Sequence, residues 1–394
     1  MAEHRRILIV AEADIASTQL LMQVMRAAAP FGIDAGLVLA RDWTSSLLPG
    51  AVTPLFARCA DPAMLPFARA LVEAGRPYLY YLDDNFWALD PATPIGAYYR
   101  HPSVRASLDF FVAHAALVLT HTPDLADALR RRGARVALVP TFFRFDLIAG
   151  IEPEASDEIR IGFAGSPGRS ADLALVTDAV APVLAADRRA VFEFIGATPP
   201  GIAAGERVRF FPARPDYAAF IAFQAARNWS IGLAPLLANA SNRSKTDNKF
   251  REYAACGVAG IYSDFGPYPA VVADGVDGLL VADGGWTEAI GALVRAPDRL
   301  LAMRRAARDA ARRRYDIGSA ASAWARVVSD AVDGFPAGHL RPMSLARVRR
   351  RLFFQPLLGV PVRVQAAYRA GGARLVAAKA GRWLGRKIGA RAPQ

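Results

Sequence analysis

Charged side chains crowd into the stretch NRSKTDNKFREYAACG, residues 242–257, directly before a small apolar run. If the segment is helical, Lys245, Lys249 and Glu252 follow at spacings of four and three and share one face. Ammonium groups and backbone N–H groups at the start of a helix favour an anion such as a diphosphate. A carboxylate one turn further accepts hydrogen bonds from ribose hydroxyls. A solvated face of helical ion pairs explains the same spacing equally well. Ser244, Thr246 and Asp247 are each able to cap the helix start.

A second phosphate-binding candidate is the glycine-rich turn in GFAGSPGRSADL, residues 162–173. Gly165 and Gly168 allow the backbone to turn tightly between a strand and a helix, with Ser166 between them. Arg169 stands where the helix starts, and its guanidinium would clamp a phosphate through two parallel hydrogen bonds. The glycines alone are weak evidence, because any tight turn uses them.

Two adjacent carboxylates, Asp83 and Asp84, end the strand-like stretch YLYYLDD. They either cap the next helix or bind an acceptor, with one carboxylate taking the proton from an attacking hydroxyl. Phe86 and Trp87 beside them form either a sugar-stacking surface or part of the core. His121, between a strand and a helix in LVLTHTPDL, is the best histidine candidate for catalysis, with a polar capping role as the alternative.

The elements that must position these residues alternate along the chain as apolar strands and amphipathic helices. Strands that are apolar almost throughout are typical of a parallel sheet covered on both faces. The pattern restarts after the short polar stretch at 150–158, which reads as a linker. We expect an α/β protein with two doubly wound, Rossmann-like domains, residues 1–149 and 159–335, facing each other across a ligand cleft. The last helices of the second domain are able to pack back on the first.

The composition argues against a disordered chain, a disulfide-stabilised protein and a membrane-spanning protein. The chain has 394 residues, 53% of them hydrophobic and 21% charged, which is typical of a folded globular protein. Cys59 and Cys256 cannot build a disulfide framework and have no metal-ligand spacing, which suits a reducing compartment. The sequence has neither a signal-peptide pattern nor an apolar run of about 18 residues, so we expect a cytoplasmic protein.

Positive charge is concentrated at the C-terminus. Residues 336–394 contain thirteen Arg and Lys and no Asp or Glu, so the first 335 residues carry about −1 of the net charge of +12. Arginines alternate there with apolar residues, which predicts a basic amphipathic helical tail. Such a tail binds an anionic membrane surface, with about 1 kcal/mol per basic residue near the surface. A solvated tail or an RNA-binding tail is the alternative.

Residues 231–315 resemble the donor-binding half of the B-type (GT-B) glycosyltransferases, particularly glycosyltransferase family 4 of bacterial surface-polysaccharide clusters. The likeness lies in the order of APL, a lysine-rich loop, KFREYAACG, a short strand, GPY, DGVDGLLV, a tryptophan and a basic helix. It implies that Glu252 binds the ribose of a nucleotide sugar and that Lys245 or Lys249 contacts its diphosphate. The family's other glutamate, which addresses the donor sugar, falls at Ser244 here. Asn242, Ser244 or the backbone after Tyr262 would then take over sugar recognition.

The resulting hypothesis is a glycosyltransferase that moves a sugar from a nucleotide-diphospho-sugar to a saccharide acceptor, which we expect to be lipid-linked. The resemblance implies retention of configuration and no bound metal or cofactor, since the nucleotide sugar is a substrate. The expected partners are the donor, the acceptor and the inner leaflet of the cell membrane, but no nucleic acid. The alternatives are a nucleotide-sugar epimerase or hydrolase on the same fold, and a non-enzymatic cleft-type binding protein whose tail binds nucleic acid or membrane.

Overall fold

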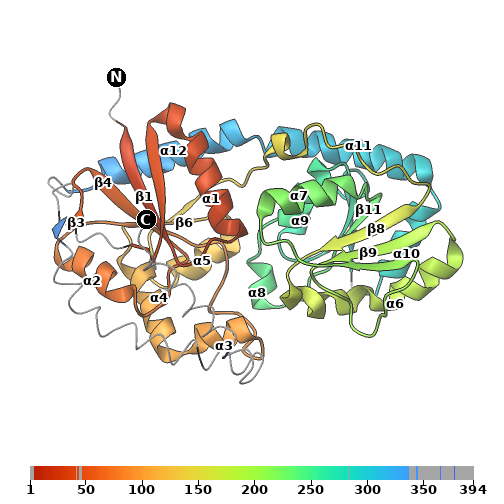
Figure 1. Ribbon diagram of the computed structural model, residues 1–394, viewed down its shortest axis with the longest axis horizontal. Coiled ribbons are helices and arrows are strands. Elements are labelled where there is room, and N and C mark those ends of the chain that lie inside the picture. Colours follow the sequence, from red (N-terminus) through yellow and green to blue (C-terminus); the bar gives the residue numbers. More distant parts are fainter. Residues whose placement is uncertain are drawn as a thin grey trace, which may run out of the picture.

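The computed structural model describes residues 4–40, 42–43, 47–282, 284–336 and 343–344, together with residues 364 and 377. Figure 1 shows two α/β lobes that lie end to end, each built around one sheet. Apart from those few positions, the basic tail expected at residues 336–394 lies outside the described residues.

The N-terminal sheet has six parallel strands in the order β2-β1-β4-β5-β6-β7. These strands are β1 (Arg5–Ala11), β2 (Ile33–Leu39), β4 (Val52–Ala57), β5 (Leu79–Tyr81), β6 (Leu117–Thr120) and β7 (Val136–Leu138). The helices around them are α1 (Ala16–Ala27), α2 (Leu65–Glu73), α3 (Pro94–Arg100), α4 (Pro102–His114) and α5 (Pro123–Arg130). A separate antiparallel pair joins β3 (Leu47–Leu48) to β14 (Met343–Ser344).

The C-terminal sheet repeats this plan with parallel strands in the order β10-β9-β8-β11-β12-β13. Its strands are β8 (Ile159–Ala164), β9 (Ala190–Ile195), β10 (Val208–Phe211), β11 (Ile231–Ala234), β12 (Ala259–Ser263) and β13 (Gly278–Val281). Its helices are α6 (Ser170–Ala186), α7 (Tyr217–Ala226), α8 (Ala240–Arg243), α9 (Asn248–Ala255), α10 (Trp286–Val294) and α11 (Pro297–Arg314). Short 3-10 turns are η1 (Ala29–Phe31), η2 (Phe145–Ile148), η3 (Pro167–Arg169) and η4 (Tyr268–Ala270).

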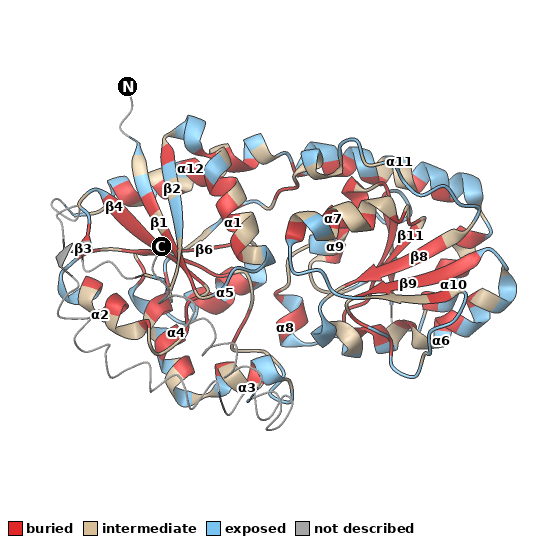
Figure 2. Cartoon of the chain, viewed as in Figure 1, coloured by how far each residue is buried: buried red, intermediate tan, exposed pale blue. Residues whose placement is uncertain are grey.

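The burial pattern explains why these segments form a two-faced parallel sheet. Strands β4, β9, β11 and β12 are buried at every residue, and Figure 2 shows β4, β9 and β11 in red beside helices with exposed outer faces. Helices on both faces leave no strand surface for polar side chains, so the strands read as continuous apolar runs. The predicted pair of doubly wound domains is therefore confirmed.

The last described helix, α12 (Ile317–Asp333), packs on the N-terminal lobe although it follows the C-terminal one (Figure 1). Trp324 of α12 is 1% exposed, packs in the same core as α1 and β1, and donates its indole N–H to the carbonyl of Pro140 at 3.0 Å. The chain therefore passes between the lobes twice, through residues 139–158 and through residues 315–316. Residues 150–158 contain neither helix nor strand.

In each sheet the strand order reverses once, at β1/β4 and at β8/β11. Ligands of doubly wound domains bind beyond the carboxyl ends of the strands at such a switch point. The loops that follow β5, β6 and β8 carry Asp83, His121 and Ser166, and all three line one pocket.

Candidate functional site

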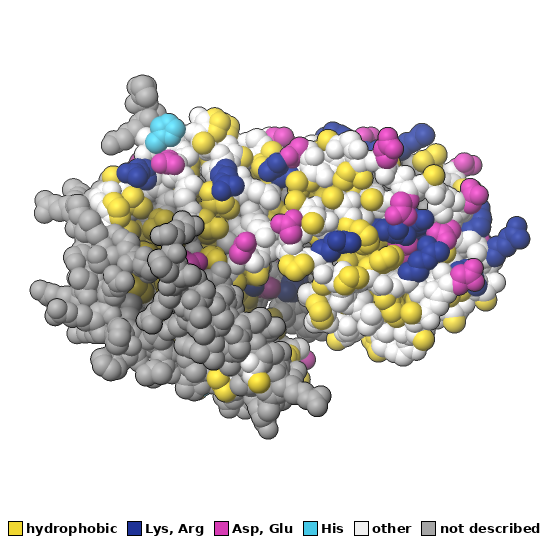
Figure 3. All heavy atoms as spheres, in the orientation of Figure 1, with side chains coloured by type: hydrophobic (Ala, Val, Ile, Leu, Met, Phe, Trp, Pro, Cys, Tyr) yellow, Lys and Arg dark blue, Asp and Glu magenta, His cyan; other side chains and the backbone are white. Residues whose placement is uncertain are grey.

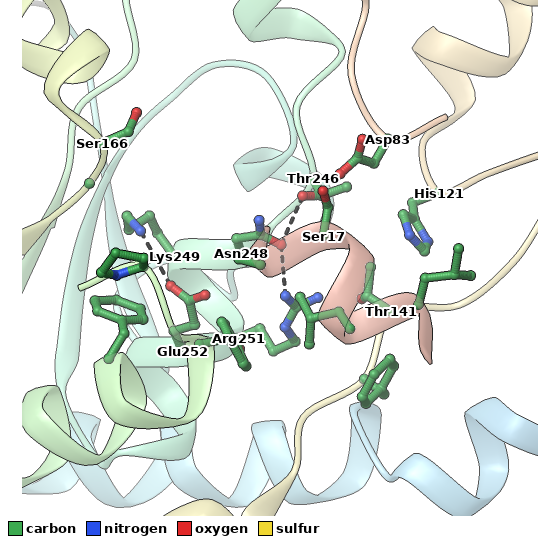
Figure 4. Close-up of a pocket in the computed structure, with 18 of the residues that line it drawn as sticks. Ser17, Asp83, His121, Thr141, Ser166, Thr246, Asn248, Lys249, Arg251 and Glu252 are labelled. Atoms are coloured by element: carbon green, nitrogen blue, oxygen red, sulfur yellow. Dashed lines mark hydrogen bonds and ion pairs between the residues drawn. The ribbon is translucent and has the colours of Figure 1, made fainter. Parts of the chain in front are cut away.

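A pocket of about 390 Å³ lies between the two lobes. One wall comes from α1, the ends of β5 and β6, and residues 141–142 of the N-terminal lobe. The other wall comes from the loops after β8, β9 and β10 and from α9 of the C-terminal lobe. Figure 4 shows Lys249, Glu252 and Arg251 projecting from α9 toward this space.

Helix α9 carries two of the three residues predicted to share its charged face. The Lys249 ammonium lies 3.3 Å from a Glu252 carboxylate oxygen, and both residues line the pocket. Lys245 lies instead in the turn between α8 and α9, where its ammonium contacts the Asp84 carboxylate of the other lobe at 2.6 Å. The prediction that Lys245 shares the helical face is therefore wrong, because the helix begins only at Asn248.

The start of α9 has no side-chain cap. Asp247 occupies the capping position, but its carboxylate accepts hydrogen bonds from the hydroxyls of Tyr315 and Thr141. The Thr246 hydroxyl donates to the Asn248 side chain at 2.8 Å, and the Ser244 hydroxyl donates to the Ala240 carbonyl at 3.4 Å. None of the three predicted caps is used, so the first N–H groups of α9 are left for a ligand or water.

The loop after β8 reaches the same pocket through Gly165 and Ser166. Gly165 donates its N–H to the carbonyl of Ile195 at 2.9 Å, which ties this loop to the end of β9. Gly196 follows with a φ of 82°, and a Cβ atom there would lie 2.2 Å from the Gly165 carbonyl oxygen. Glycine is therefore required where the two loops approach each other at the pocket wall.

Arg169 and Asn242, both predicted to bind the donor, are hydrogen-bonded to each other. The Arg169 guanidinium contacts the Asp172 carboxylate at 3.0 Å and donates to the Asn242 amide oxygen at 3.0 Å. The Asn242 amide nitrogen donates to the same carboxylate at 2.8 Å. Neither residue lines the pocket, nor does the 3% exposed Ser244. Arg169 and Asn242 thus tie the first turn of α6 to α8.

The carboxylates after β5 are held by cations. Asp83 lines the pocket and pairs with Arg58, while Asp84 pairs with Lys245. Burial by itself raises the pKa of Asp84, but Lys245 and Arg58 hold it below its usual value. The capping interpretation is wrong for both, because the next helix begins at Pro94 and is capped by Thr93.

His121 lines the pocket, but both of its ring nitrogens are engaged. Nδ1 lies 2.9 Å from the Val139 carbonyl oxygen, which only accepts, so Nδ1 carries the proton. Nε2 therefore accepts the hydrogen bond from the Tyr81 hydroxyl at 2.9 Å. Burial lowers the pKa of His121, which favours this neutral form. The arrangement fits a positioning role better than proton transfer.

The residues suggested for acceptor stacking lie away from the pocket. Phe86 is 1% exposed and stacks on Tyr99 with ring centroids 3.9 Å apart, so the core interpretation is correct. Trp87 donates its indole N–H to Asp109 at 2.7 Å and lines a separate hollow on α4.

Sequence reasoning missed several residues of the pocket wall. Arg251 precedes Glu252 in the same charged stretch, but its side chain leaves α9 in a different direction, toward Thr141 (Figure 4). Ser17 comes from α1, and nothing in its sequence context marks it. Tyr217 opens α7, and the apolar sequence around it gives no sign of a binding role.

None of the helices in the described residues is long and apolar enough to cross a membrane. In the same part of the chain, no group of three or more His, Cys, Asp or Glu side chains is arranged to hold a metal ion.

Comparisons with known proteins agree with this architecture. Residues 158–298 match the family model described as "Glycosyl transferases group 1". No curated protein sequence matches the chain. Anabaena HepE, solved in complex with UDP, is 14% identical and superposes with a TM-score of 0.59 over 82% of this chain and 100% of HepE. Sucrose-phosphate synthase from Thermosynechococcus elongatus is 13% identical, with a TM-score of 0.62 over 84% of this chain and 100% of that chain. These similarities identify the fold as GT-B, and the family match to the C-terminal lobe supports a glycosyltransferase.

Proposed function

We propose that the chain is a retaining, metal-independent hexosyltransferase of the family 4 type. It transfers a sugar from a nucleotide-diphospho-sugar to a lipid-linked saccharide during the assembly of a surface polysaccharide. The observation that carries the donor assignment is the Lys249–Glu252 pair at the uncapped start of α9, on the wall of the pocket between the lobes.

The donor fits the chemistry of the C-terminal wall. The free N–H groups of α9 and the Lys249 ammonium attract a diphosphate. Glu252, one turn further, accepts hydrogen bonds from ribose hydroxyls. Ile195, Ala213 and Pro215 offer an apolar surface for the base. The structures of Anabaena HepE with UDP and with UDP-glucose support a nucleotide-sugar donor.

The reaction breaks the bond between the anomeric carbon and the phosphate oxygen and forms a bond to the acceptor oxygen. The start of α9 and Lys249 stabilise the charge that develops on the departing diphosphate, which is the task a metal ion would otherwise serve. Asp83 lines the opposite wall, beside the space where an acceptor hydroxyl would enter. Closure of the two lobes excludes water and limits hydrolysis of the donor.

A thermal-shift panel of nucleoside diphosphates and nucleotide sugars tests the donor assignment. We expect one nucleotide to raise the Tm of the wild type by mass action. Lys249→Ala and Glu252→Ala should each abolish most of this shift, whereas Arg305→Gln, at an exposed position of α11, should leave it unchanged. A panel without any response, or variants that respond like the wild type, would contradict the proposal.

A further inference from the structure

Beyond the Lys249–Glu252 pair, the pocket contains a cation that the donor contacts above do not use. Arg251 is 3% exposed, and it lines the pocket. Its guanidinium lies on the side of Asn248 and Thr141, whereas Lys249 and Glu252 lie on the side of Ser166 (Figure 4). Arg251 and the Lys249–Glu252 pair thus occupy different parts of the pocket wall (Figure 4).

Arg251 has fewer partners than a buried guanidinium needs. One terminal nitrogen donates to the Asn248 amide oxygen at 2.8 Å, while Nε is buried and has no hydrogen-bond partner in the part of the chain that the structure describes. Within the described residues Arg251 forms no ion pair. Buried arginines are almost always paired with an anion, because an unpaired buried charge is costly.

The two carboxylates that affect the pKa of Arg251 already bind other side chains. Asp247 accepts hydrogen bonds from Tyr315 and Thr141, and Glu252 pairs with Lys249. Burial by itself lowers the pKa of Arg251, but Tyr217, Asp247 and Glu252 hold it above its usual value. The guanidinium therefore stays charged in the wall of the pocket.

The N-terminus of α1 faces the same part of the pocket from the other lobe. Helix α1 has 12 residues, no side-chain cap at Ile15 and no acidic residue in its first turn. Ala16 and Ser17 line the pocket, and the buried Ser17 hydroxyl has no hydrogen-bond partner among the described residues. The Gln19 side chain of α1 accepts the N–H of Tyr217 at 3.0 Å, which brings this end of α1 against the C-terminal lobe.

We propose that Arg251, Ser17 and the first turn of α1 form a binding subsite for a carboxylate or phosphate group of the ligand held in the cleft. A guanidinium offers two parallel donors to such a planar or tetrahedral oxyanion, and the helix N-terminus adds N–H groups and a positive dipole. The subsite rests on the proposed function, since its occupant is part of the donor or the acceptor. The oxyanion is either the carboxylate of a hexuronic acid in the donor or a phosphate of the acceptor.

Isothermal titration calorimetry distinguishes these sources in the full chain. UDP, GDP and ADP first identify the base. The affinity for the neutral nucleotide hexose with that base is then compared with the affinity for the corresponding nucleotide hexuronate. If UDP binds, for example, UDP-glucose is compared with UDP-glucuronate. A second arm titrates glycerol 3-phosphate into the complex with the nucleoside diphosphate. Each ligand is measured on the wild type, Arg251→Gln, Arg251→Lys, Ser17→Ala and the control Arg305→Gln.

We expect one anionic ligand to depend on the subsite. Either UDP-glucuronate binds the wild type at least about tenfold more tightly than UDP-glucose, or glycerol 3-phosphate binds the nucleotide complex. Arg251→Gln should remove that binding or preference, Arg251→Lys should retain part of it, and Ser17→Ala should weaken it about threefold. Arg305→Gln should change nothing. The affinity for the nucleoside diphosphate alone should fall by less than about threefold in Arg251→Gln.

Two outcomes would overturn the subsite. The first is an equal loss of affinity for nucleoside diphosphate and anionic ligand in Arg251→Gln, which would make Arg251 part of the diphosphate site. The second is no preference for the anionic ligand in either arm. If no nucleoside diphosphate binds the wild type, the proposed function fails. Glucuronate and inorganic phosphate titrated alone then test the subsite, and an unchanged response in Arg251→Gln refutes it.

Discussion

Lys245 of the C-terminal lobe forms an ion pair with Asp84 of the N-terminal lobe. The ammonium and carboxylate lie 2.6 Å apart, and their side chains are 27% and 20% exposed. The pKa of Asp84 is lower in the folded protein than its unperturbed value of about 3.9. A carboxylate with a depressed pKa contributes stability above its unfolded pKa and loses it as the pH falls through the folded pKa. The pair should therefore stabilise the protein at neutral pH and fade below about pH 4.

We predict that Lys245→Met lowers the free energy of unfolding by about 1.5–3 kcal/mol at pH 7, because it leaves Asp84 without its main partner. Urea unfolding at pH 7, 5 and 3 measures the loss. It should be the same at pH 7 and 5 and smaller at pH 3, where Asp84 begins to protonate. A double-mutant cycle with Asp84→Asn isolates the pair. A loss that is equal at all three pH values, or a coupling free energy near zero, would contradict this account.

Individual site residues were predictable where charge interrupts an apolar pattern. Asp83 and Asp84 stand out because they end an apolar strand, and Lys249 and Glu252 because they lie in a densely charged stretch before an apolar run. The structure brings all four to the space between the lobes. Their partners were not predictable, since Asp84 and Lys245 are 161 positions apart in the chain. Helical spacing describes neighbours within one element only.

Strand β9 contains a buried charge that its neighbours neutralise. Glu193 is 0% exposed within a strand that is otherwise apolar. Its carboxylate accepts hydrogen bonds from Arg227, at 2.9 Å from Nε, and from the indole of Trp229 at 2.8 Å. Arg227 also pairs with Glu154 at 2.6 Å, in the segment between the two sheets. This network fastens the connecting segment to β9 and to the end of α7.

We predict that Glu193→Ala lowers the free energy of unfolding by about 3–5 kcal/mol, because it leaves Arg227 buried with too few acceptors. Urea unfolding followed by far-UV circular dichroism measures the change. Glu206→Ala, an exposed glutamate of the same lobe, is the matched control and should cost no more than about 0.5 kcal/mol. Equal stability of the two variants would show that the network contributes little.

Elements were more predictable than their ends. The strands follow from continuous apolar runs, because helices cover both faces of each sheet. The start of α9 did not follow from capping residues, since Asp247 turns to Tyr315, a residue 68 positions later. The contact with Tyr315 decides whether Asp247 caps the helix. The helix start in turn decides which residues share its charged face.

At the scale of the whole molecule, the N-terminal lobe is completed by the last described helix. Trp324 of α12 contacts Tyr81, with ring centroids 5.9 Å apart, and it lines the pocket beside His121. The second crossing of the chain therefore connects α11 of the C-terminal lobe directly to the wall of the N-terminal lobe. Relative movement of the lobes would change the pocket from both sides at once.

The net charge is distributed unevenly over the chain. On the face seen in Figure 3, Lys and Arg side chains of the C-terminal lobe are interspersed with Asp and Glu. The first 335 residues carry about −1, whereas residues 336–394 carry thirteen basic residues and no acidic one. A body with almost no net charge gives little attraction to an anionic bilayer, so membrane binding should depend on the C-terminal segment.

We predict that the protein floats with vesicles of anionic phospholipid at low salt and not with phosphatidylcholine vesicles. Replacing Arg349, Arg350 and Arg351 by Gln should weaken this binding by about 100-fold, at about 1 kcal/mol for each basic residue near the surface. The matched control replaces three exposed arginines of α11, Arg299, Arg305 and Arg313, and should float like the wild type. Binding should also fall as salt rises, because exposed charges are screened within about 8–10 Å. Equal losses in the two triple variants would assign the attraction to total charge, and the absence of flotation at low salt would refute membrane binding.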